Sequence, residues 1–106
     1  MSEQIILNAI EALVCIKEFV SENPNCKFYI GKTDDYARRE QEHLSHGYSG
    51  FKVISQTSSI EELNKLERLL IMISRVFYKE NLENENNGGG GNISESSDYY
   101  IYITSK

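Results

Sequence analysis

A polar stretch near the end of the chain, residues 80–98, limits what this sequence can fold into. It is rich in Asn, Glu, Gly and Ser, and residues 88–91 are four consecutive glycines. Such a composition buries little apolar surface, so we interpret residues 80–97 as a mobile loop. The whole chain has 106 residues, of which 40% are hydrophobic. This is enough for one hydrophobic core but too little for two, so we expect a single domain over residues 1–106.

Three segments have the spacing of helices. In residues 3–20, apolar side chains recur at Ile6, Ile10, Leu13 and Val14, the period of an α-helix. Thr33 is the expected N-cap of a second helix over residues 34–45. Ser58 or Ser59, followed by Glu61 and Glu62, starts a third helix that runs to about Lys79. The expected buried stripe of this third helix consists of Leu63, Leu66, Leu70, Ile73 and Phe77.

Three short runs that are rich in aromatic and β-branched residues read as strands. They cover residues 27–31, 51–57 and 99–104. The predicted order is therefore helix, strand, helix, strand, helix and, after the polar stretch, a last strand.

The charge pattern argues against broad binding to nucleic acid. The net charge is -5 and the pI is about 5.0, whereas non-specific affinity for phosphates comes mainly from Lys and Arg. Residues 27–52 are nevertheless slightly basic, with five Lys and Arg against four Asp and Glu, and a local cluster can bind phosphate on an acidic protein. Because residues 1–4 lack a basic, apolar leader and no long apolar run follows, we expect a cytoplasmic protein.

A set of polar residues occupies positions that should face inward. Arg39 and His43 are four residues apart on the second helix, with Tyr36 three residues before Arg39, and Glu67 lies on the apolar stripe of the third helix. Such a set suits phosphodiester hydrolysis, in which a carboxylate holds a divalent cation, a guanidinium neutralises phosphate and a neutral imidazole or a phenol helps remove a proton from water. A structural ion pair between Glu67 and Arg39 explains the same pattern.

These residues resemble the second half of the GIY-YIG nuclease motif set. In that family the YIG tyrosine is followed ten residues later by an arginine and fourteen later by a His or Tyr, and Tyr29, Arg39 and His43 have the same spacing. A helical glutamate follows, here Glu67, and the resemblance covers residues 28–71. It implies an α+β fold with a small antiparallel sheet flanked by helices.

The resemblance also implies a function, that of an endonuclease that hydrolyses phosphodiester bonds in DNA. Glu67 would be the sole protein ligand to Mg²⁺ or Mn²⁺, Arg39 would stabilise the charge on phosphorus, and Tyr29 or His43 would position or deprotonate water. Asn84, in a passage similar to N-x-N-x-G-G, is a further catalytic candidate, although the same asparagines could simply make turns in a solvated linker. The candidates for substrate contact are Lys32, Arg38 and Tyr36.

The first half of the motif set has no counterpart before Tyr29. One hypothesis is that the last strand lies beside the Tyr29 strand, so that Tyr100 or Tyr102 replaces the missing phenol, since both share one strand face. The alternative function is a degenerate module that binds nucleic acid or protein without cutting. A domain of this size has little room for its own recognition module, so a homodimer or a partner protein could supply specificity.

Overall fold

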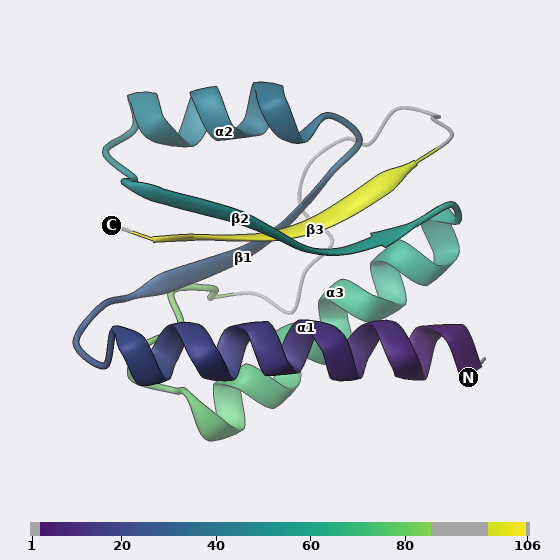
Figure 1. Ribbon diagram of the computed structural model, residues 1–106, viewed down its shortest axis with the longest axis horizontal. Helices are drawn as coiled ribbons and strands as arrows, with labels where there is room; N and C mark the ends of the chain where they lie inside the picture. The colour runs from purple at the N-terminus through teal and green to yellow at the C-terminus, as the bar shows by residue number, and fades with distance from the viewer. Residues whose placement is uncertain (1–2, 86–97, 106) are drawn as a thin grey trace.

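The computed structural model describes residues 3–85 and 98–105, which form three helices and three strands (Figure 1). The helices are α1 (Glu3–Glu22), α2 (Tyr36–Ser45) and α3 (Ile60–Phe77), and the strands are β1 (Phe28–Thr33), β2 (Gly50–Thr57) and β3 (Tyr99–Ser105). The predicted α+β class is confirmed. Within the described residues, no helix combines the length and the hydrophobicity that crossing a membrane requires.

The last strand of the chain is the central strand of the sheet. The strand order is β1-β3-β2, and β3 runs antiparallel to both neighbours. Tyr102 therefore lies opposite Gly31 on one side and Val53 on the other. The hypothesis that the C-terminal segment pairs beside the Tyr29 strand is confirmed.

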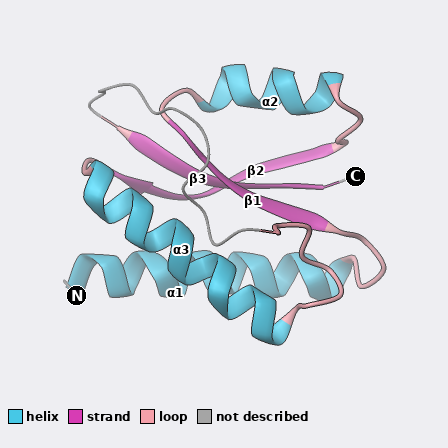
Figure 2. Ribbon diagram, turned by 180° about the vertical axis from the view of Figure 1, so that it is seen from behind, coloured by secondary structure: helices cyan, strands magenta, loops and turns pink. Residues whose placement is uncertain are grey.

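The sheet separates two unequal layers. Helices α1 and α3 cover one face, while α2 alone lies over the other (Figures 1 and 2). The hydrophobic core lies between the sheet and the α1/α3 layer, where Phe28, Ile30 and Ile101 pack against helix residues such as Leu66 and Leu70. None of the residues of α2 is fully buried. The α2 side is thus the thinner layer, and its contacts with the sheet are aromatic and polar.

Helix α1 packs through a different face from the one that the sequence emphasises. Its buried residues are Ile5, Ala9, Ala12 and Ile16, whereas Ile6, Ile10 and Val14 remain about half exposed. Both sets recur at helical spacing, so periodicity alone did not separate them. The face that carries Ala9 and Ala12 packs inward, and Ile6, Ile10 and Val14 stay outside.

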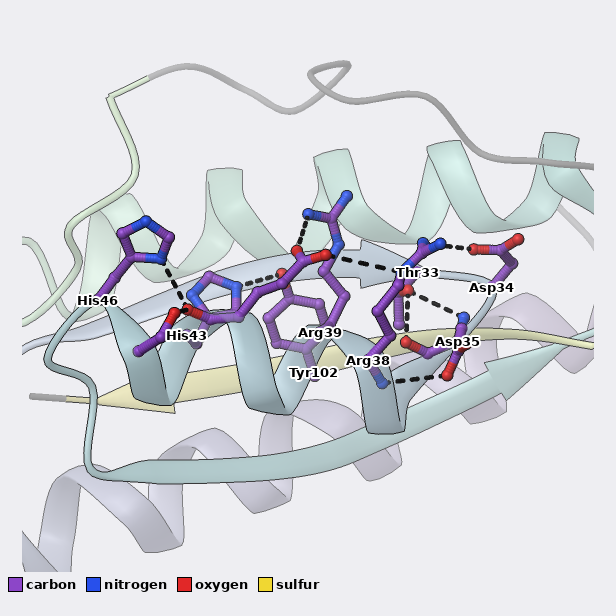
Figure 3. Close-up of polar contacts among 10 residues, drawn as sticks. Thr33, Asp34, Asp35, Arg38, Arg39, His43, His46 and Tyr102 are labelled. Carbon is purple, nitrogen blue, oxygen red and sulfur yellow. Dashed lines mark hydrogen bonds and ion pairs between the residues drawn. The ribbon is translucent and has the colours of Figure 1, made fainter.

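The structure also differs from the sequence prediction at two helix ends. Thr33 lies in β1, and Asp35 is the N-cap of α2, because its carboxylate accepts a hydrogen bond from the Arg38 backbone N–H at 3.1 Å (Figure 3). Thr33 instead shapes the turn before α2 by accepting a hydrogen bond from the Asp35 N–H at 2.9 Å. In α3, the expected cap at Ser59 is confirmed, but Phe77 is 73% exposed and does not extend the buried stripe.

The described part of the predicted loop covers the outer edge of β1. The N–H of Phe28 donates to the carbonyl of Asn81 at 2.7 Å, and the N–H of Glu83 donates to the carbonyl of Phe28 at 2.8 Å. Leu82 forms a parallel bridge with Phe28 and packs against the core. Residues 81–84 therefore cover the outer edge of β1. The rest of the predicted loop, residues 86–97, lies outside the described residues.

Candidate active site

A hydrogen bond between α2 and the central strand is the centre of the site. The Nε2 atom of His43 lies 2.8 Å from the hydroxyl of Tyr102, and Figure 3 shows the two side chains pointing toward one another between helix and sheet. Tyr29, on the neighbouring strand β1, reaches the same space, with its ring centroid 6.0 Å from that of His43. Two tyrosines from adjacent strands thus flank one histidine.

Two further aromatic residues hold His43 and Tyr102 in place. The ring of Tyr102 stacks on Phe51 of β2 at a centroid distance of 4.7 Å, and Tyr48 packs edge-on against His43 at 5.1 Å. Neither Tyr48 nor Phe51 was among the site residues predicted from the sequence. Nothing in their local sequence pattern distinguishes them, because they reach His43 only through the strand order and the turn after α2.

Tyr102 and Tyr100 have different surroundings although they share a strand face. Tyr102 is 3% exposed and contacts the histidine, whereas Tyr100 packs edge-on against Tyr36 near the start of α2 at 4.9 Å. Of the two candidates for the missing phenol, Tyr102 is therefore the one that lies with His43.

Arg39 lies on α2 one turn before His43, and its guanidinium is only partly paired. Its Nη1 donates to Glu42 at 2.9 Å, but its buried Nε has no hydrogen-bond partner among the described residues. The positive charge of Arg39 also affects the pKa values of Tyr29, His43 and Tyr102. The Arg39 side chain is 28% exposed, so its guanidinium charge is suited to an anionic oxygen.

Glu67 is buried on α3 and forms an ion pair with Lys32. The Lys32 Nζ lies 3.3 Å from Glu67 Oε1, with both side chains 6% exposed, and Nζ also donates to Asn64 at 2.8 Å. The proposed ion pair between Glu67 and Arg39 is absent from the described residues, where Arg39 pairs with Glu42. The negative charge of Glu67 still contributes to the raised pKa values of Tyr29 and Tyr102. The carboxylate is therefore electrostatically coupled to both phenols.

The pKa shifts assign different protonation states to the phenols and the imidazole. Burial, followed by the charge of Glu67, raises the pKa of Tyr29, and burial raises the pKa of Tyr102 well above its usual range. Burial, followed by the charge of Arg39, lowers the pKa of His43. Near neutral pH both phenols are thus protonated donors, and the imidazole is neutral and able to accept a proton.

Asn84 binds the backbone of β1 through its side chain. Its Oδ1 accepts from the Ile30 N–H at 2.8 Å, and its Nδ2 donates to the Ile30 carbonyl at 2.8 Å. These two bonds continue the edge cover of residues 81–84. Asn84 was a candidate catalytic residue, and in this structure its amide supports the strand that carries Tyr29.

The three candidates for substrate contact lie in different environments. Lys32 is buried with Glu67 and does not present its ammonium group to solvent. Arg38 and Tyr36 are exposed on α2, where Arg38 pairs with Asp34 at 3.4 Å and with Glu42 at 3.7 Å. Only Arg38 and Tyr36 are thus open to a large ligand.

Among the described residues, no group of three or more His, Cys, Asp and Glu side chains is arranged to hold a metal ion. A cation at Glu67 would compete with Lys32 for the carboxylate.

Comparison of this chain with family models, with curated proteins and with solved structures found no match.

Proposed function

We propose that this protein is a metal-dependent endonuclease of the GIY-YIG type that hydrolyses phosphodiester bonds in DNA. The observation that carries the proposal is the position of Tyr102, which lies on the strand next to Tyr29 and within hydrogen-bond distance of His43. The segment before Tyr29 lacks the tyrosine that the first half of the motif set would supply. The strand that supplies it is the last in the chain, so the motif set would be complete in space with its first half moved to the C-terminus.

The roles of the polar groups follow from their charge states. Arg39, whose side chain is 28% exposed, would bind a phosphate oxygen through its guanidinium group and stabilise negative charge that develops on phosphorus. The attacking water would donate its proton to the Tyr102 oxygen while the Tyr102 proton passes to the neutral Nε2 of His43. Tyr29 would remain a protonated donor that orients the water or the phosphate.

Glu67 is the residue that would hold the divalent ion. A bound Mg²⁺ or Mn²⁺ supplies a Lewis acid that neutralises phosphate charge. Lys32 keeps the carboxylate in place by an ion pair and, because its ammonium is 3.3 Å away, would have to share that oxygen or withdraw. Arg38 and Tyr36, exposed at the start of α2, would contact the DNA backbone beside the reacting phosphate.

The test is cleavage of supercoiled plasmid and of branched DNA by the purified protein with Mg²⁺ or Mn²⁺. We expect metal-dependent cutting that falls by about 10²-fold or more in Arg39→Ala, Glu67→Ala and Tyr102→Phe. Glu61→Gln is the matched control, since Glu61 is an exposed carboxylate on the same helix. If wild type cuts no more than these three variants, the nuclease proposal is wrong.

A second function is favoured by the buried pair of Lys32 and Glu67. A carboxylate that is already neutralised fits a module that binds nucleic acid or protein without cutting. For such a module, fluorescence anisotropy would detect metal-independent binding of branched DNA, lost in Arg39→Ala, in the absence of any cleavage. Metal-dependent cleavage by the wild type would exclude this second function.

A further inference from the structure

Helix α1 has a second apolar face, which the core does not use. Its outer side chains Ile6, Leu7, Ile10 and Val14 are 46%, 54%, 53% and 48% exposed. Four large aliphatic residues on one exposed stripe of a single helix form a contiguous apolar surface, which in soluble proteins marks an interaction site.

Nothing in the described part of the molecule covers this face. Figure 1 draws α1 below the sheet and in front of α3, and Figure 2, seen from behind, draws α3 in front of α1. A partner can therefore reach the stripe from Glu3 to Lys17 without moving another described element.

The sequence of this face is symmetric about Ile10. Ile6 and Val14 are four residues to either side, and Leu7 and Leu13 are three residues to either side. Glu3 and Lys17, both exposed, are seven residues to either side and carry opposite charges. When two such helices lie antiparallel with their Ile10 residues facing each other, residue i of one helix meets residue 20 minus i of the other.

We propose that this face binds a second copy of the chain, with the two α1 helices antiparallel about a two-fold axis at Ile10. Ile6 of each copy then packs against Val14 of the other, on either side of the central Ile10 pair. Glu3 of each copy pairs with Lys17 of the other. A two-fold axis uses the same patch twice, so one self-complementary helix face closes the assembly as a dimer.

Charge complementarity favours a second copy over an unrelated partner. The charged residues that end the stripe have opposite signs at equal distances from its centre, which is what antiparallel self-pairing requires. Within one copy Glu3 and Lys17 lie about 21 Å apart along the helix axis and cannot pair. The proposal does not depend on the nuclease chemistry, because α1 and the aromatic site lie on opposite faces of the sheet.

The first test is the molar mass of the full-length protein as a function of concentration, measured by analytical ultracentrifugation. We expect a dimer whose dissociation constant rises about tenfold or more in Ile10→Glu, because the substitution brings two carboxylates together at the axis. Val76→Glu is the matched control, since it places the same charge on an exposed aliphatic site of α3. A wild-type protein that stays monomeric at all concentrations would overturn the proposal, as would dissociation by Val76→Glu with none by Ile10→Glu.

A charge-reversal series separates pairing between copies from damage to the helix. Glu3→Lys alone and Lys17→Glu alone each place like charges opposite one another, so each is expected to weaken the dimer several-fold at low salt. The double variant Glu3→Lys/Lys17→Glu restores opposite charges only between antiparallel helices, so its dissociation constant should return close to that of wild type. Circular dichroism checks that the helix content is unchanged. If the double variant weakened the dimer by the combined effect of the two single variants, the antiparallel arrangement would be ruled out.

Discussion

Gly31 and Tyr102 are cross-strand partners, and the tyrosine ring occupies the space that a side chain at Gly31 would need. A Cβ built on Gly31 would lie 2.3 Å from both the Cζ and the hydroxyl oxygen of Tyr102. The ring cannot easily move aside, because it is stacked on Phe51 and hydrogen-bonded to His43. The glycine of the YIG sequence is therefore required here for space, since its backbone φ is not positive.

We expect Gly31→Ala to displace the Tyr102 ring and to lower the free energy of unfolding by about 1–3 kcal/mol. Urea denaturation measures the loss. Gly50→Ala is the control, since its Cβ would meet only the Ser105 hydroxyl, a group that can rotate away. In a Tyr102→Ala background the added cost of Gly31→Ala should nearly disappear. An equal cost in both backgrounds would show that the steric explanation is wrong.

Lys32 and Glu67 should behave as a buried pair whose partners depend on each other. Lys32→Met leaves a buried carboxylate without its cation, so we expect a loss of about 3–5 kcal/mol, and a double variant Lys32→Met/Glu67→Gln that costs less than the sum of the single changes. Denaturant titrations of the four proteins measure this coupling. The exposed pair Lys65–Glu61, treated the same way, should give a coupling of about 1 kcal/mol or less. Similar coupling energies in the two cycles would contradict the burial argument.

Asn84 should contribute to stability through the edge of β1. Asn84→Ala removes both side-chain hydrogen bonds to Ile30, so we expect a loss of about 1–3 kcal/mol and faster hydrogen exchange at the Ile30 amide. Asn8→Ala, which removes two exposed hydrogen bonds, one from Gln4 and one to Gln56, should have little effect. An Asn84→Ala protein with unchanged stability and protected Ile30, but no cleavage of DNA, would assign Asn84 to catalysis instead.

The lowered pKa of His43 predicts how stability changes with pH. The folded state holds the proton more weakly than the unfolded chain, whose histidine pKa is about 6.5. The contribution of His43 to the free energy of unfolding is therefore fully present above about pH 6.5 and is lost as the pH falls toward the folded pKa. Denaturation at several pH values should show this decline in wild type and a weaker one in His43→Gln.

NMR titration gives the pKa of His43 directly, and His46→Gln identifies the signal by removing the other imidazole. Because the charge of Arg39 is the second cause of the shift, Arg39→Gln should move the pKa of His43 upward. A pKa that does not respond to Arg39→Gln would place the guanidinium too far from the imidazole to act on it.

The local sequence determined the secondary structure and part of the site. Each helix and strand was predicted from apolar periodicity, caps and β-branched runs, which depend only on neighbouring residues. The spacing of Tyr29, Arg39 and His43 likewise required no tertiary information, because a strand followed by a helix places these residues by local geometry alone.

Tertiary structure decided which distant residues meet. The pairing of β3 with β1 brings Tyr102 to His43 across 59 positions, and the packing of α3 gives Glu67 the partner Lys32 in place of Arg39. Packing also selected the face of α1 with two alanines for the core and left the face centred on Ile10 outside. Periodicity determines which residues share a helix face. Which of two apolar faces is buried, and which of the two cations Lys32 and Arg39 pairs with Glu67, depends on the contacts that the assembled layers allow.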